Sequence, residues 1–388
     1  MIEILNKKDC CGCTACEQVC PTNCISMLFD DEGFLYPSVN TEMCISCNLC
    51  VKVCPILNKK KSKKTDVEAY AAYTDNDEIR LKSSSGGLFT IFANQIFNQG
   101  GMVAGAAFDN EFMVEHIVIE SNEELNKLQG SKYLQSNMKN SLKEVKTYLD
   151  QNTKVLFTGT ACQIEGLKRY LRKEYSNLYT IDVLCHGVPS PKVWKKYLSE
   201  KELEYGSKLQ QTFFRKKDFG WKRFALSLKY KDKAYLKNHH DDPFMKLFLN
   251  EICLRPSCHD CKFKDFPRES DLTIGDAWGI ENHMSDMDDD KGTSVLITNS
   301  KKGNELLSSV RKKLVIKEAE LDVILPATAD SRKSVIPHKN RELFFKELDQ
   351  KNINQLCKYI EKPIYQKVYQ KVRRKIERII VKLKENDI

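Results

Sequence analysis

The cysteine-rich stretch CCGCTACEQVCP occupies residues 10–21 and spaces four of its cysteines as C-x2-C-x2-C-x3-C, followed by proline. The same pattern returns in CISCNLCVKVCP at residues 44–55. Loops with two-residue gaps can present three thiolates to one cubane, and thiolates are the soft ligands that iron–sulfur clusters take. This spacing is typical of bacterial ferredoxins that hold two 4Fe-4S clusters.

The ligands of the two predicted clusters follow from the ferredoxin rule that the fourth cysteine of each run binds the other cluster. The first cluster is expected to take Cys10, Cys13, Cys16 and Cys54. The second cluster is expected to take Cys44, Cys47, Cys50 and Cys20. A zinc site is the alternative, but zinc usually takes two C-x2-C pairs. Cys11 and Cys24 lie outside the pattern and are expected to be bystanders.

The chain has 388 residues, which is long enough for more than one hydrophobic core. Its formal charge of +9 is unevenly spread, because the first 57 residues carry three lysines against seven acidic residues and the basic run NKKKSKKT follows them. We expect a dicluster ferredoxin-like domain at 1–57, a basic linker at 58–65, a larger α/β domain at 66–300 and a C-terminal region at 301–388.

The cellular setting and the far end of the chain carry weaker signals. Sixteen cysteines without an apolar secretory leader indicate a reducing, oxygen-poor cytoplasm, because clusters and thiolates are readily oxidised. No apolar run reaches the length of a bilayer. Residues 364–386 predict a basic amphipathic helix, which could dock on a membrane or on a partner protein, although packing on its own protein is the commoner use. Nucleic acid is not an expected partner.

The pattern of strands, turns and helices after the linker predicts an α/β fold. A strand at 67–75, a helix at 88–97 and a strand at 102–108 form one strand–helix–strand unit. Residues 154–171 add a strand, a tight turn and a helix, and residues 179–189 add a strand that ends in a turn. Open α/β sheets bind ligands where their strands end.

Two turns of small residues could hold a flavin. SSSGG at 83–87 offers backbone N–H groups at a helix start, as phosphate sites do, although an ordinary capped helix start gives the same pattern. GSKY at 130–133 adds a lysine that could neutralise a pyrophosphate and a tyrosine that could stack on a ring; a surface turn is the alternative. A flavin is favoured because it exchanges single electrons with clusters and hydride with a substrate.

Four further cysteines could hold a third 4Fe-4S cluster, namely Cys162, Cys185, Cys258 and Cys261. The last two form a C-x2-C pair, and the first two follow predicted strands. A small buried hydrophobe is the alternative role for a free cysteine after a strand. Cys253 could replace one of the four, and Cys357 is expected to be structural.

Residues 1–300 resemble the beta subunits of coenzyme F-420 hydrogenases and dehydrogenases, in the form that carries an N-terminal two-cluster ferredoxin domain. The resemblance rests on SSSGG at 83, GSKYLQS at 130, GTACQIEGL at 159, LCHGVP at 184, FRKKDFGW at 214, RPSCHDCKF at 255 and SDLTIGDAWGI at 270. It implies an FAD-binding α/β domain with an iron–sulfur cluster, which passes electrons between iron–sulfur partners and a hydride acceptor.

The resemblance also implies roles for single residues. The predicted flavin contacts are Ser84, Ser85, Gly86, Gly87, Gly130, Ser131, Lys132, Tyr133 and Thr160. His186 and Asp276 would border the flavin ring as catalytic residues. Ala161 departs from the family, which commonly has proline there, so this turn is looser.

A basic and aromatic patch is predicted to contact an acidic, planar or phosphorylated substrate through Arg215, Lys216, Trp221 and Arg223. A solvated hairpin edge is the alternative. The expected function is a cytoplasmic iron–sulfur flavoprotein oxidoreductase that transfers hydride to or from a small molecule. One alternative is oxidation of reduced deazaflavin coenzyme F-420 with electrons leaving through the clusters. Another is an electron-transfer subunit without its own substrate, whose partner is a ferredoxin or an oxidoreductase subunit.

Overall fold

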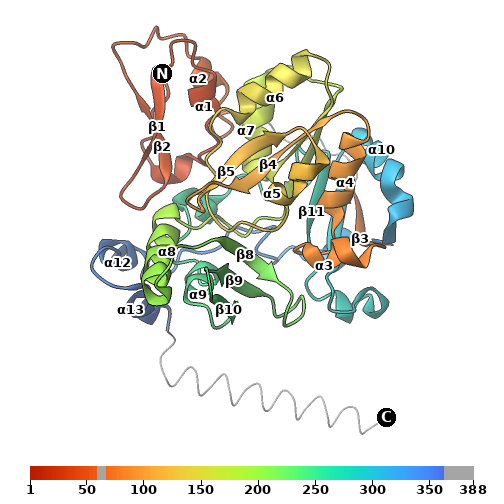
Figure 1. Cartoon of the computed structure of the whole chain (residues 1–388). Helices are drawn as coiled ribbons and strands as arrows, with labels where there is room; N and C mark the ends of the chain where they lie inside the picture. Colours follow the sequence, from red (N-terminus) through yellow and green to blue (C-terminus); the bar gives the residue numbers. More distant parts are fainter. Residues whose placement is uncertain (59–66, 362–388) are drawn as a thin grey trace.

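The computed structural model describes residues 1–58 and 67–361, which form a small N-terminal lobe beside a larger α/β body (Figure 1). The predicted C-terminal helix and the predicted linker, apart from Asn58, lie outside the described residues.

The N-terminal lobe contains two copies of one loop-and-helix unit. Thr14 and Asn48 both adopt a left-handed backbone with φ of 58°, and each is followed directly by a helix of four residues. The strands pair antiparallel, with Ile25 opposite Val39. The lobe comprises η1 (Lys7–Asp9), α1 (Ala15–Gln18), β1 (Ile25–Phe29), β2 (Leu35–Val39) and α2 (Leu49–Lys52). The repeated cysteine run therefore folds as a repeated unit.

An eight-stranded mixed sheet forms the centre of the body, in the order β13-β3-β12-β11-β7-β6-β4-β5. The four strands β11, β7, β6 and β4 run parallel, and the strands on either side of them pair antiparallel. The strands are β3 (Glu68–Thr74), β4 (Met102–Phe108), β5 (Val114–Ile119), β6 (Val155–Thr160), β7 (Leu178–Val183), β11 (Leu272–Asp276), β12 (Ser294–Thr298) and β13 (Leu314–Ala319).

Helices cover both faces of this sheet because successive residues of a strand point to opposite sides. Val103 and Leu156 pack with one layer, while their neighbours Ala104 and Phe157 pack with the other. The first layer contains α4 (Leu88–Phe97) and α10 (Lys301–Val310), and the second contains α6 (Ser141–Asp150) and α7 (Ala161–Leu171). Shorter helices in the body are α3 (Asp77–Lys82), η2 (Asn122–Glu124), α5 (Leu125–Leu128), η4 (Ile280–Asn282), η5 (Ser285–Met287), η6 (Arg311–Lys313) and α11 (Leu321–Ile324).

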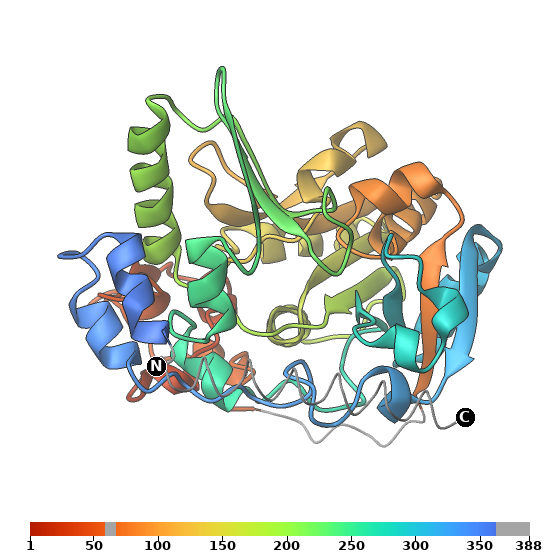
Figure 2. The same ribbon diagram turned by 90° about the horizontal axis from the view of Figure 1, so that it is seen from below.

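A second, three-stranded sheet in the order β10-β9-β8 has its own aromatic core with Trp194 and Phe214. Figure 2 shows the C-terminal helices α12 and α13 beside α8 in this part. Its elements are α8 (Pro191–Tyr205), β8 (Gln211–Lys216), β9 (Ala225–Lys229), β10 (Ala234–Asn238), α9 (Pro243–Leu249), η3 (Pro256–Asp260), α12 (Arg341–Lys346), α13 (Ile353–Leu356) and η7 (Cys357–Ile360).

The mixed α/β class is confirmed, and the expected strands and helices at 67–75, 88–97 and 154–171 are present. The pairing differs from a simple strand–helix–strand unit, because β3 lies between β12 and β13 and four strands separate it from β4. The helix α3, which was not predicted, stands between β3 and the SSSGG turn. The sheet also continues past residue 300, since Leu314 of β13 pairs with Thr74 of β3.

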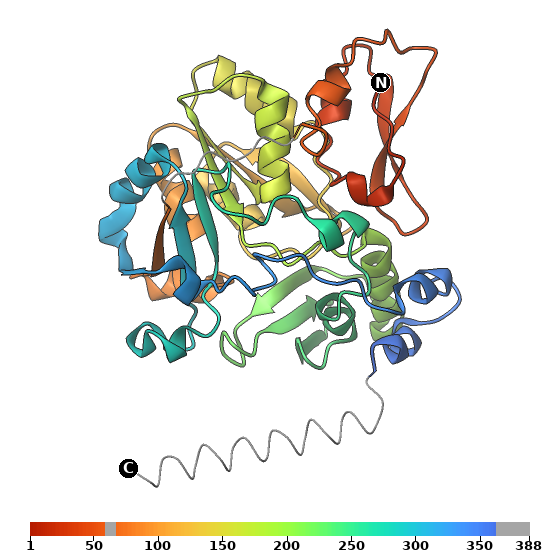
Figure 3. The same ribbon diagram turned by 180° about the vertical axis from the view of Figure 1, so that it is seen from behind.

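The N-terminal lobe packs against α6 and α7, as Figure 3 shows from behind. The side-chain oxygen of Gln18 accepts hydrogen bonds from the backbone of Leu142 and Lys143 at the start of α6. A Cβ atom on Gly166 of α7 would lie 2.7 Å from the Cβ of Cys13, so the first cysteine loop touches the helix backbone there. Within the described part of the chain, no helix combines the length and apolarity needed to cross a membrane.

Candidate functional site

The predicted ligands of the second cluster surround one small cavity in the N-terminal lobe. Cys44, Cys47 and Cys50 reach it from the second run, and Cys20 reaches it from the first. Cys47 is exposed, so this cavity lies at the outer surface of the lobe. The grouping supports the crossed assignment of ligands.

The predicted ligands of the first cluster lie deeper, towards the body. Burial raises the pKa of Cys16, and the neighbouring thiols of Cys10 and Cys54 raise it further. Cys13 is buried against α7. Four converging thiols from two separate runs are the donor set that a 4Fe-4S cubane takes, so the residues fit the group.

Two cysteines expected to be bystanders also lie at these sites. The Sγ of Cys24 is 3.3 Å from the Sγ of Cys20. Burial raises the pKa of Cys20, but hydrogen bonds from Thr22 and Cys24 outweigh burial and lower it to about 7. Cys11 packs in the same layer as Cys13 and lines the same cavity as Cys162. Its pKa is raised by Cys13 and by burial, which outweigh a lowering by Cys162. Spacing alone could not place these two cysteines beside the predicted ligands, because it contains no information on tertiary contacts, and their role as bystanders stays a prediction.

The inner thiol set comprises the four cysteines that are predicted to hold the third cluster, Cys162, Cys185, Cys258 and Cys261. All four line one cavity of the body. Burial raises the pKa values of Cys185, Cys258 and Cys261, and repulsion from neighbouring cysteines of the set raises them further. Cys162 lies in the first turn of α7, which Thr160 and Gln163 cap, and the Sγ of Cys162 is 3.1 Å from the Thr160 hydroxyl. Cys253 is instead fully buried in the aromatic core.

The cavity beside the inner thiol set has a volume of about 840 Å³. This lies within the ~300–1,000 Å³ of typical ligand sites. Most of the predicted flavin contacts line it, together with Arg215, His186 and Asp276. The residues fit a large aromatic cofactor because backbone turns, apolar side chains and polar groups share one space with the thiols.

A hydrogen-bonded network joins predicted site residues that are far apart in sequence. The Ser84 hydroxyl accepts from the Ser131 N–H at 2.8 Å and lies 2.9 Å from the Ser131 hydroxyl. The Arg215 guanidinium donates to the Ser84 carbonyl at 3.1 Å and to the Tyr133 hydroxyl at 3.1 Å. It also forms a two-armed ion pair with Asp276 at 2.8 and 2.9 Å. The structure therefore brings the two predicted turns together.

Some predicted flavin contacts have their polar groups engaged by the protein. The Lys132 ammonium donates to the carbonyls of Leu128, Gln129 and Gly130, and burial lowers its pKa to about 7. Gly86 does not line the cavity; a Cβ there would lie 2.6 Å from the Ala72 carbonyl oxygen, so its small size serves packing.

The predicted substrate patch is divided between the cavity wall and its surroundings. Arg215 lines the cavity, whereas Lys216, Trp221 and Arg223 do not. Trp221 is fully buried, donates from Nε1 to Asp276 at 2.8 Å and stacks on Trp278. Arg223 is exposed.

His186 lies beside the inner thiol set and faces two carboxylates. Its ring nitrogens are each 3.5 Å from a carboxylate oxygen, of Glu251 and of Asp330. The ring contacts Phe248 edge-on. Its predicted catalytic role stays a prediction.

Sequence reasoning missed a buried pair on the cavity wall. The His116 Nδ1 lies 2.6 Å from the Ser136 hydroxyl, and its Nε2 lies 3.1 Å from the Thr158 carbonyl oxygen. Burial lowers the pKa of His116 to about 4, so the ring is neutral at pH 7. A carbonyl only accepts, so Nε2 carries the proton and the Ser136 hydroxyl donates to Nδ1. Ser136 ends the GSKYLQS motif, which gave no role to this serine, and none of the quoted motifs contains His116.

The fold and the cysteine sites define the chain as an iron–sulfur protein of mixed α/β structure. Comparison with protein families gives the particular group. Residues 9–57 match the 4Fe-4S dicluster domain. Residues 69–143 and 152–323 match the N-terminal and C-terminal models of the coenzyme F420 hydrogenase/dehydrogenase beta subunit. These two models together match more than half of the chain, which belongs to this family of oxidoreductase subunits.

Among solved structures, the chain is similar to a chain of the F420-reducing NiFe hydrogenase complex from Methanosarcina barkeri. The two are 18% identical with a TM-score of 0.47, and the match covers 66% of this chain and 83% of that chain. No curated protein sequence matches this chain.

Proposed function

We propose that this protein is an iron–sulfur flavoprotein oxidoreductase. The two clusters of the N-terminal lobe and a third 4Fe-4S cluster on the inner thiol set would connect a redox protein partner to FAD in the large cavity. When bound, FAD supplies the exchange between single electrons and hydride. The main observation in support of this proposal is that the inner thiol set and the predicted flavin turns line the same cavity.

The position of Cys11 supports an electron path between the two lobes. Cys11 lines the same cavity as Cys162 of the inner thiol set, and it packs in the same layer as Cys13, a predicted ligand of the first cluster. Electrons would therefore enter or leave at the outer cluster beside the exposed Cys47, and the first cluster would lie between that point and the cavity.

The cavity wall offers a specific group to a flavin ring. Because the Ser136 hydroxyl gives its one proton to His116, its oxygen can only accept towards the cavity. An acceptor of this kind suits a ring N–H. The Arg215 guanidinium, already paired with Asp276, keeps the Ser84 and Ser131 turns together at the same wall.

Anaerobic purification tests the proposal by measuring iron and flavin together. We expect about twelve irons and one flavin per chain, because each 4Fe-4S cluster holds four irons. C162S and C258S should each reduce the iron to about eight while the clusters of the N-terminal lobe persist. C253S is the matched control and should keep all the iron, because Cys253 lies in the aromatic core.

The outcome also separates the possible roles. Iron at about eight per chain in the wild type would refute the third cluster. Full iron without flavin would refute the flavoprotein and favour an electron-transfer subunit. Bleaching of the bound flavin by reduced coenzyme F-420 would support oxidation of that coenzyme, while no reaction would leave a different small-molecule partner for hydride.

A further inference from the structure

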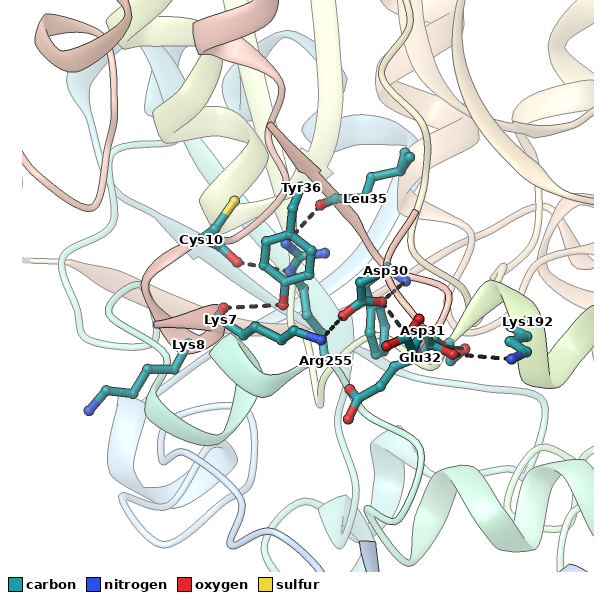
Figure 4. Close-up of polar contacts among 12 residues, drawn as sticks. Lys7, Lys8, Cys10, Asp30, Asp31, Glu32, Leu35, Tyr36, Lys192 and Arg255 are labelled. Carbon is teal, nitrogen blue, oxygen red and sulfur yellow. Dashed lines mark hydrogen bonds and ion pairs between the residues drawn. The ribbon is translucent and has the colours of Figure 1, made fainter. Parts of the chain in front are cut away.

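Arg255 is a fully buried cation whose hydrogen-bond acceptors are all uncharged. Its guanidinium donates to the backbone carbonyls of Cys10 at 2.8 Å and Leu35 at 2.9 Å (Figure 4). It also donates to the side-chain oxygen of Gln135 at 3.0 Å. Among the residues that the structure describes, none gives Arg255 a carboxylate partner. An isolated buried charge is strongly unfavourable, so a compensating negative charge is required nearby.

The guanidinium lies inside the first cysteine loop. Gly12, between Cys10 and Cys13, has φ of +72°, and a Cβ there would lie 3.2 Å from both the Cζ and an Nη of Arg255. A Cβ there would lie still closer, 2.3 Å, to the amide nitrogen of Gln135, so the glycine leaves room for both the cation and its Gln135 partner next to the ligands of the first cluster. Tyr36 covers the cation, with its ring centre 4.2 Å from Cζ.

The backbone of Arg255 is hydrogen-bonded to residues beside the inner thiol set. The Arg255 N–H donates to the Val188 carbonyl at 3.0 Å, and the Cys258 N–H donates to the Arg255 carbonyl at 2.9 Å. Val188 in turn donates its N–H to the Sγ of Cys258 at 3.4 Å. One residue therefore joins the loop of the first cluster to the loop of the inner thiol set.

The hydrogen bonds place the cation between the two groups of predicted ligands. The Cys10 carbonyl accepts from the guanidinium and the Cys258 N–H donates to the Arg255 carbonyl, so a cluster bound at either group would bring its negative charge near the cation.

Arg341 provides a contrast at the same junction between the two lobes. It forms a two-armed ion pair with the Glu32 carboxylate and also donates to the Leu254 carbonyl. Its charge is neutralised locally, as is usual for a buried or half-buried arginine.

We propose that Arg255 is the positive charge shared by the first cluster of the N-terminal lobe and the cluster on the inner thiol set, and that it raises the reduction potential of both. A fixed cation stabilises the reduced cluster, which carries one more negative charge than the oxidised one. The second cluster, at the outer surface, lies outside this effect. The part of this inference that concerns the inner thiol set rests on the proposed third cluster. The effect of Arg255 on the first cluster does not depend on it.

The test is a potentiometric titration of the full chain, purified without oxygen and followed by electron paramagnetic resonance. Wild type should show three one-electron steps. In R255Q, the reduction potentials of two steps should fall by about 59 mV or more. For a one-electron step, this shift lowers the ratio of reduced to oxidised cluster at a fixed potential tenfold. R255K keeps the charge and should stay within about threefold of wild type, or about 30 mV. R341Q also loses a contact between the lobes and should shift no step.

Four results would overturn the proposal: R255Q with full iron that titrates as wild type, an equal shift of all three steps, a shift in R341Q as large as in R255Q, or an R255K shift as large as in R255Q. If R255Q loses its iron, the R255K variant provides the test, because lysine keeps the charge but not the hydrogen bonds of the arginine. Unchanged potentials in R255K would support a charge effect, and tenfold shifts would refute it. Wild-type iron of about eight per chain would refute the third cluster, and with it the sharing of Arg255 between two clusters. The effect on the first cluster would then be tested by itself, since R255Q should shift one of the two remaining steps and the absence of a shift would refute that effect as well.

Discussion

Replacing Asp276 by asparagine should show whether the Arg215–Asp276 pair holds the cavity wall together. The Arg215 side chain is 3% exposed and that of Asp276 is 20% exposed. D276N leaves the buried guanidinium without its counter-charge, and breaking such a pair costs ~3–5 kcal/mol of unfolding free energy. Because Asp276 keeps some contact with water, we expect the lower end, about 3 kcal/mol.

A double-mutant cycle measures the pair itself. R215M should also cost about 3 kcal/mol, because it leaves a half-buried carboxylate unpaired. The double variant should cost about 4 kcal/mol rather than about 6, since removing both charges leaves neither of them unpaired. Anaerobic urea unfolding followed by circular dichroism gives the three values. K216M is the neighbouring control and should change stability by less than ~0.5 kcal/mol, because Lys216 is outside the network.

Additive losses, within ~0.5 kcal/mol, would refute the pairing argument. If D276N keeps wild-type stability but no longer transfers hydride, Asp276 has a chemical role. That result would contradict its role in holding the cavity wall together.

Three further perturbations test the same structure. Replacing glycine by alanine in a helix interior ordinarily stabilises a protein by about 1 kcal/mol. G166A should instead destabilise this protein and release iron, because the new Cβ would lie 2.7 Å from the Cβ of Cys13 and 3.0 Å from its Sγ. Iron content and thermal unfolding measure the two effects. His116 has a folded pKa of about 4, below its unfolded value of ~6.5, so the unfolded chain binds more protons and stability should fall by about 2 kcal/mol from pH 7 to pH 5. H116Q should lose that part of the pH dependence, and an unchanged slope would contradict the assignment. D182N should lower stability by ~3 kcal/mol or more, since fully buried Asp182 pairs with Arg268 and accepts from Ser270 and Thr273; urea unfolding that matches wild type would argue against it.

Local spacing in the sequence carries the information for the N-terminal lobe. The intervals within each cysteine run set which thiols one loop can present, and the two runs indeed fold as two copies of one unit. Strand and helix patterns such as 154–171 are equally local, since their periodicity reports which side chains face the core. The small-residue turns were also visible, but their contact through Ser84 and Ser131 was not.

Tertiary structure decided the contacts between distant residues that no sequence motif connects. It placed β3 between β12 and β13, brought Cys11 to the cavity that Cys162 lines, and set Arg255 in the loop around Gly12. It also placed Trp221, a predicted substrate contact, in the interior, where its ring N–H donates to Asp276. The physical reason is that these contacts result from how whole layers pack, and the identities of neighbouring residues along the chain do not specify which layers meet.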